Sequence, residues 1–153
     1  MELEVNMKAT VKKRYQELKI QNYNSLIKRE WQSNALLQEC LETLGNNKKI
    51  LSIEEQRQIL DKFNIELPRL IKNRKKTVQS IQELSPQWMN RLVYIIWDEE
   101  KLPIIQINFE SVLNHIDDIV AVAFDTCIVA ENMNQFIQFD DRNRITEFNL
   151  ERE

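Results

Sequence analysis

The stretch that decides the fold lies in the last third of the chain, where residues 119–150 read IVAVAFDTCIVAENMNQFIQFDDRNRITEFNL. Its apolar residues come in short runs in which hydrophobic and polar positions alternate, a pattern typical of strands with one face against a core. Polar segments at residues 131–134 and 140–143 carry the asparagine and aspartate that turns favour. We therefore expect a small antiparallel β-meander, with apolar runs at residues 119–124, 127–129, 136–139 and 145–150.

The first 84 residues are predicted to be helical. The sequence holds a single glycine, Gly45, whereas sheets and phosphate-binding loops usually need several glycines for positive φ angles. Gly45 directly follows an apolar helical stripe, which is typical of a left-handed C-terminal cap. Ser52 and Glu55 form an S-x-x-E capping box that opens the next helix. Pro68 is expected in the first turn of a further helix.

Residues 86–97 can be interpreted in two ways. Ser85 and Pro86 are a helix-start signal, and apolar residues follow them at helical spacing. The run at residues 92–97, LVYIIW, also has high β propensity. We favour the helix because the cap signal precedes the run.

The fold class that follows is α+β, with N-terminal helices packed against a small C-terminal antiparallel β-meander. A chain of 153 residues is long enough for one hydrophobic core, and we find no internal repeat or linker. We expect a single domain over residues 1–153, with a mainly helical part at 1–97 and a mainly antiparallel sheet part at 102–153.

Charge is divided unevenly along the chain. Residues 1–101 hold 18 Lys and Arg against 14 Asp and Glu, a balance of +4, whereas residues 102–153 hold 3 against 10, a balance of −7. Such asymmetry bears on binding partners rather than on the fold. We predict an acidic partner-binding surface. Trp97 is expected in the core, or, if it is exposed beside Asp98, as an aromatic anchor of that surface. The candidate residues are Asp98, Glu99, Glu100, Asp117, Asp118, Asp125, Asp140, Asp141 and Trp97.

The sequence offers little support for an enzyme. His115, the only histidine, could act as a general base beside a carboxylate, but no nucleophile or substrate pocket is specified with it. Serine elbows, P-loops, Rossmann glycines and zinc spacings are absent from the sequence. We expect no catalytic residues, no metal and no cofactor. Cys40 and Cys127 lack C-x-x-C spacing and are expected to be buried thiols of a cytoplasmic protein with no membrane span.

An alternative function rests on a basic segment at residues 69–76. Five of these eight residues are Lys or Arg, and on a helix they could contact phosphates of a nucleic acid. No nucleic-acid-binding motif surrounds them and no aromatic residues are interleaved with them, so we favour a solvated helix face.

Three segments of the last third resemble the closing part of immunity proteins from bacterial polymorphic toxin systems, including contact-dependent growth inhibition. The segments are FDTCIV at residues 124–129, FIQF at 136–139 and RITEF at 144–148. The resemblance implies a soluble, cytoplasmic, non-enzymatic protein that binds and neutralises one cognate toxin domain. Toxin domains of this kind are often basic nucleases, which an acidic surface would attract. Inhibition could work by plugging the toxin's active site or by pairing an edge strand with its sheet.

Overall fold

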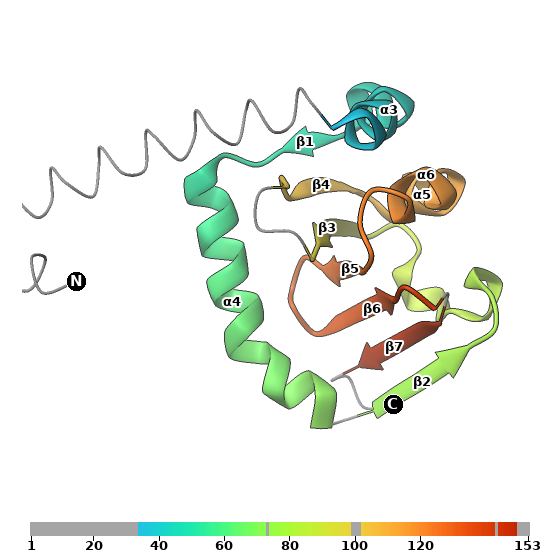
Figure 1. The fold of residues 1–153 in the computed structure, drawn as a ribbon. Coiled ribbons are helices and arrows are strands. Elements are labelled where there is room, and N and C mark those ends of the chain that lie inside the picture. The colour runs from blue at the N-terminus through green and yellow to red at the C-terminus, as the bar shows by residue number, and fades with distance from the viewer. Residues whose placement is uncertain (1–33, 73, 99–101, 143, 150–153) are drawn as a thin grey trace, which may run out of the picture.

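The computed structural model describes residues 34–72, 74–98, 102–142 and 144–149, and in them a seven-stranded sheet lies between two layers of helix (Figure 1). The order across the sheet is β1-β4-β3-β5-β6-β7-β2, and every neighbouring pair is antiparallel. The strands are β1 (Lys49–Ile50), β2 (Arg74–Val78), β3 (Leu92–Trp97), β4 (Ile105–Asn108), β5 (Thr126–Ala130), β6 (Gln135–Phe139) and β7 (Ile145–Asn149).

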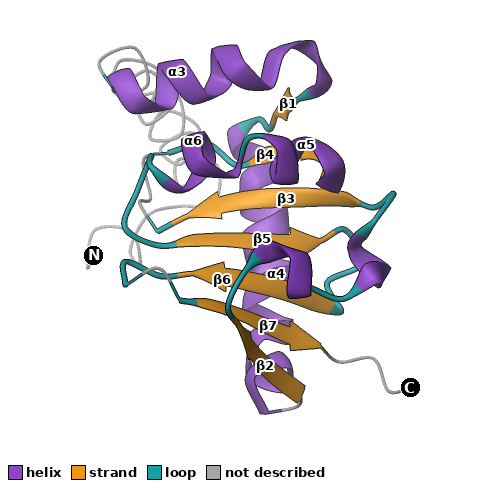
Figure 2. Cartoon of the chain, turned by 90° about the vertical axis from the view of Figure 1, so that its right-hand side faces the viewer, coloured by secondary structure: helices purple, strands orange, loops and turns teal. Residues whose placement is uncertain are grey.

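The helices are divided between the two faces of the sheet (Figure 2). The long helix α4 (Ile53–Lys72) covers one face, and α3 (Ala35–Leu44), α5 (Phe109–Asn114) and α6 (Ile116–Val120) cover the other. Three single 3-10 turns complete the described elements: η1 (Gly45–Asn47), η2 (Ile81–Glu83) and η3 (Pro86–Trp88). The predicted α+β class is confirmed.

The central strands bury both of their faces. Along β5, Ile128 packs in the core under α3, α5 and α6, whereas Val129 packs in the core under α4. Ile137 and Phe136 divide in the same way along β6. Successive side chains of a strand point to opposite faces, so one apolar run supplies two cores.

The local signals near the turns of the chain are confirmed. Gly45 ends α3 with the positive φ of 65° that favours glycine, and its backbone N–H donates to carbonyls of the last turn of the helix, although its ψ of −147° differs from that of a left-handed cap. Ser52 Oγ accepts from the Glu55 backbone N–H at 3.2 Å, and Glu55 Oε1 accepts from the Ser52 N–H at 3.0 Å. The meander is also confirmed for the three strands β5, β6 and β7.

The helix favoured for residues 86–97 is wrong. Ser85 and Pro86 open only the turn η3, and Asn90 with φ 63° then prevents a helix from continuing. Residues 92–97 form β3, which pairs with β4 on one side and β5 on the other. The β propensity of this run therefore prevails, because a central strand buries its side chains on both faces.

Two further boundaries differ from expectation. Pro68 opens no new helix but lies inside α4, where Ile59, Phe63 and Leu70 form one continuous buried stripe. Burial of that stripe outweighs the cost of one missing backbone hydrogen bond. Residues 119–124 form no strand, because Ile119 packs as part of α6 and the chain then turns into a loop. The helices expected before residue 34 lie outside the described residues.

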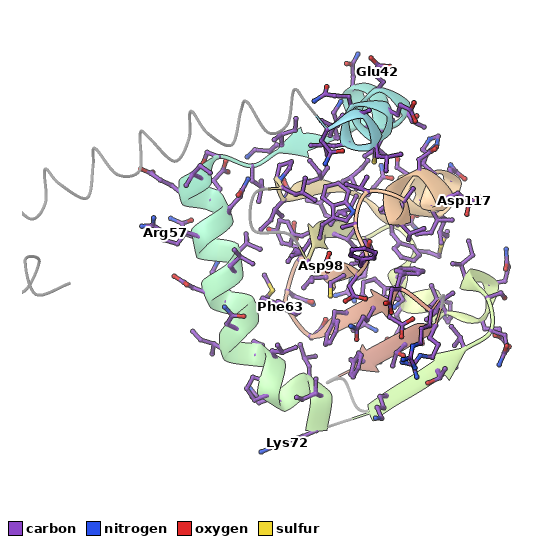
Figure 3. The ribbon with its side chains drawn as sticks, in the orientation of Figure 1. Glu42, Arg57, Phe63, Lys72, Asp98 and Asp117 are labelled. Carbon is purple, nitrogen blue, oxygen red and sulfur yellow. The ribbon has the colours of Figure 1, made fainter. Side chains whose placement is uncertain are left out.

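The docking of α4 on the sheet can be tested with Phe63, which points from the helix toward the strands (Figure 3). Its ring packs edge-on against Phe136 with centroids 5.3 Å apart. Phe63→Ala is expected to lower the free energy of unfolding by about 3–5 kcal/mol in urea denaturation, because it leaves a cavity between the layers. Ile65→Ala is the matched control, since this side chain on the same helix is 71% exposed and its loss should change stability by less than about 0.5 kcal/mol. Equal losses for both variants would contradict the packing.

Candidate functional site

One end of the sheet is formed by five strands whose terminal residues stand in a single row. These residues are cross-strand partners in the order Trp97, Thr126, Phe139, Ile145 and Val78. Asp98 follows the first of them, Asp125 precedes the second, and Asp140 and Asp141 follow the third. The pairing of strands far apart in sequence thus brings four aspartates to one row of strand termini. We call this part of the sheet the acidic end.

Asp98 and Asp125 are held beside each other. The Asp98 backbone N–H donates to the Asp125 carbonyl oxygen at 3.2 Å, which extends the β3–β5 ladder by one step. The pKa of the neighbouring Cys127 thiol is raised to about 12, first by burial and then by the carboxylates of Asp125 and Asp98. Cys127 therefore stays a neutral thiol and adds no reactivity to this end of the sheet.

Asp140 has a structural task in the turn between β6 and β7. Its Oδ1 accepts from the backbone N–H groups of Arg142 and Arg144 at 2.9 Å each, and its Oδ2 accepts from Arg144 Nε at 2.8 Å. These contacts, the Arg144 N–H first among them, lower the pKa of Asp140. Hydrogen bonds and the Arg144 guanidinium within the protein thus offset much of the negative charge of Asp140. Asp141 beside it is exposed and forms no ion pair with any described residue.

A hollow of about 420 Å³ opens on the α6 side of the acidic end. Asp117 from α6 and Asp140 and Asp141 from the β6–β7 turn line it, so residues more than 20 positions apart meet at one site. The remaining lining is largely apolar and includes Ile116, Val120, Phe124, Phe139 and Ile145. The hollow thus combines an apolar wall with carboxylates.

A second hollow of about 590 Å³ lies over strands β2, β6 and β7 on the opposite face of the sheet, and its lining has a different charge. Asp125, Asp140 and Asp141 reach it, but Lys75, Arg142 and Arg144 line it as well. Cations and carboxylates offset each other there. The hollow on the α6 side is lined by three carboxylates and by no Lys or Arg, and Asp117 in it forms no ion pair with a described residue.

Some predicted site residues are placed elsewhere. Trp97 as an exposed anchor is wrong: it is 4% exposed, and its Nε1 donates to the Ile119 carbonyl at 2.9 Å, which fastens α6 to the sheet. Asp118 is exposed on α6 and contributes, after burial, to the raised pKa of Cys40 in α3, so it lies on the α3 side of that helix. Glu99 and Glu100 lie outside the described residues.

The basic segment is not one helix, so the alternative reading of residues 69–76 as a basic helix is wrong. Arg69 and Lys72 end α4, whereas Lys75 and Lys76 belong to the edge strand β2. The strand pairs with β7, and this long-range pairing ends the helix before the basic run does.

Phe124 lines the first hollow, and sequence reasoning missed it. Its position within an apolar run predicted burial in a strand, yet its side chain is 77% exposed in the loop between α6 and β5. Helical spacing of Ile116, Ile119 and Val120 was the signal that could have moved the strand start beyond it.

The described residues contain no group of three His, Cys, Asp or Glu side chains placed to hold a metal ion. The aspartates are spread along a surface rather than gathered around a point. In the same part of the chain, no helix is long and apolar enough to cross a bilayer.

Comparison with protein-family models now supplies a second, independent observation. The model described as CdiI immunity protein EcoliA0-like matches residues 34–148, which spans both helical layers and the whole sheet. The chain belongs to the CdiI immunity protein family. Comparison with curated proteins finds no match. Membership in the CdiI family makes the chain a toxin-neutralising immunity protein of a contact-dependent growth inhibition system, as the resemblance of residues 124–148 implied.

For this CdiI family member, the role of Asp140 can be tested by acid titration of stability. Its folded-state pKa lies below the usual value of 3.8, so the carboxylate stabilises the fold at pH values above 3.8, and this contribution disappears as the pH falls through the lowered pKa. Asp140→Asn is expected to be less stable than the wild type at pH 7 in urea denaturation, with the difference shrinking toward pH 3 and below. Asp141→Asn, one position away, should match the wild type at both pH values. Identical behaviour of the two variants at pH 7 would show that the turn does not depend on Asp140.

Proposed function

We propose that this immunity protein neutralises a basic toxin domain, a nuclease, by binding it at the acidic end without performing a reaction itself. The single observation that supports the site is the convergence at one end of the sheet of carboxylates that follow β3, precede β5, and lie on α6 and in the β6–β7 turn. Asp98, Asp117, Asp125 and Asp141 are the proposed contacts, and Asp140 shapes the turn that presents Asp141. The free thiols Cys40 and Cys127 support the reducing cytoplasm as the place of action.

The acidic end can act on a basic toxin in two ways, by speeding its encounter and by competing with its nucleic acid. Carboxylates gathered on one edge attract a cationic surface over about 8–10 Å at physiological ionic strength, which raises the association rate. A nuclease binds phosphates with cationic side chains. Carboxylates can occupy the same side chains, so an acidic inhibitor competes directly with the nucleic acid.

The charge and length of the edge strands favour one of the two modes of inhibition. The free edge of the sheet at β2 carries the exposed Lys75 and Lys76, and β1 at the other edge is only two residues long. A cationic edge strand repels a basic partner and is a common device against strand pairing. We therefore favour occupation of the toxin's active site by the acidic end over pairing with an edge strand.

Charge reversal tests the surface. The variant carrying Asp98→Lys, Asp117→Lys and Asp141→Lys should associate at least about tenfold more slowly at low salt with the toxin domain encoded beside the immunity gene. The matched control carries Glu42→Lys, Glu54→Lys and Asp61→Lys, which are exposed positions on α3 and α4. Both variants change the net charge equally. If the acidic end drives the encounter, only the first should associate more slowly in stopped-flow or surface-binding measurements. Equal slowing of both would mean that overall charge, not the acidic end, drives encounter.

The nuclease assignment has its own test. The purified toxin domain should cleave RNA or DNA in a gel assay, and one equivalent of the immunity protein should abolish cleavage. Added nucleic acid should in turn slow formation of the complex, because both bind the same cationic surface. A toxin domain that cleaves neither RNA nor DNA would remove the nuclease from the proposal and leave the neutralisation by binding in place.

A further inference from the structure

Phe124 is the most exposed large hydrophobic residue in the described part of the chain. Its side chain is 77% exposed, and no other aromatic residue appears among the exposed large hydrophobic residues there. Aromatic side chains dominate the energetics of protein interfaces because they bury a large area. An exposed ring beside a hollow is therefore a feature that folding alone does not explain.

The loop around Phe124 holds the ring in the solvent from both sides. Before it, Val122 is buried and Ala123 packs against the core. After it, the Asp125 carbonyl accepts the hydrogen bond from the Asp98 N–H. The segment is thus fastened on each side of the ring, which holds the ring at the surface.

The hollow beside this ring has walls that are anchored in the core. Ile116, Val120 and Ile145 line the hollow and also pack against the core cluster, and Phe139 belongs to that cluster. A volume of about 420 Å³ lies within the usual range of about 300–1,000 Å³ for binding pockets. The walls are therefore preformed, and a partner would bind without having to order them.

The carboxylates in the hollow indicate what kind of partner it can bind. Asp117 and Asp141 line the hollow and form no ion pair with a described residue. Carboxylates at this position repel phosphates, which argues against a nucleic acid or an anionic lipid surface. They complement a Lys or Arg, and the apolar wall complements an aliphatic or aromatic side chain.

We propose that Phe124 and this hollow form the hydrophobic anchor of the toxin complex, in which the hollow receives an apolar toxin side chain neighboured by a Lys or Arg. This inference rests on the proposed function for the identity of the partner. Its physical consequence is different, because the carboxylates govern the association rate whereas a desolvated apolar anchor governs the dissociation rate.

Phe124→Ala tests the anchor. The variant should keep the thermal stability and the association rate of the wild type, since the ring lies in solvent, but should dissociate from the toxin domain at least about tenfold faster. This increase should persist at high salt. Ile65→Ala is the matched control, because Ile65 is 71% exposed on the outer side of α4 and should leave the dissociation rate unchanged.

Gln82→Trp tests the hollow independently of the ring. Gln82 is exposed in η2 and lines the hollow, so an indole there fills the space without disturbing the core. Affinity for the toxin domain should fall at least about tenfold, whereas Gln58→Trp on the exposed side of α4 should have no effect.

A photo-reactive benzophenone side chain in place of Phe124 identifies what lies against it. Cross-linking in the complex should give an adduct with an apolar toxin segment that contains Lys or Arg. Adducts with a second copy of the immunity protein, or wild-type dissociation of both Phe124→Ala and Gln82→Trp from a toxin that the wild type binds, would overturn the anchor and leave the proposed function standing. Failure of the wild type to bind the toxin domain would instead overturn the proposed function.

Discussion

The two-sided burial of the central strands is the constraint on which the rest of the structure depends. β3, β5 and β6 each send alternate side chains into a core under α4 and into a core under α3, α5 and α6. Charged residues are disfavoured along such strands, because burying a charge without a partner costs free energy of folding. A buried carboxyl group needs hydrogen-bond partners, and Glu147 on β7 has them: it accepts from Trp88 Nε1 at 2.7 Å and from Ser85 Oγ at 3.0 Å. The aspartates of the acidic end lie where the strands end, so an open sheet with both faces buried carries these charges at its strand termini.

The parts of the fold that were predictable from the sequence are those decided locally. The turn residues between β5, β6 and β7, the cap at Gly45 and the box of Ser52 and Glu55 act over a few positions, and each was predicted correctly. The parts that were not predictable depend on pairing at a distance. β2 becomes a strand by joining β7, which lies about 70 positions later, and β3 becomes one by joining β4 and β5. In both cases local helix signals gave way to the burial and hydrogen bonding of a sheet.

In the candidate site, too, some features were predictable from the sequence and others depend on contacts between distant residues. The acidic character of the C-terminal third is visible in composition, but the proximity of Asp98 to Asp125 exists only through the β3–β5 register. Asp140 and Asp141 look equivalent in sequence, and only the contacts to Arg142 and Arg144 separate a turn-forming carboxylate from a free one. Of the two roles considered for Trp97, the structure shows the core position, whereas Phe124 is exposed although its apolar run predicted burial. Trp97 fastens α6, and Phe124 stands in solvent.

Hydrogen–deuterium exchange of the immunity protein, alone and bound to its toxin domain, tests most directly that the acidic end is the binding surface. Exchange is expected to slow on binding in residues 116–126 and 139–145, which carry α6, the loop with Phe124 and the β6–β7 turn. The outer turns of α4 and the edge strand β2 should exchange as they do in the free protein. Protection confined to β2 or to α4, with the acidic end unchanged, would contradict the proposed surface.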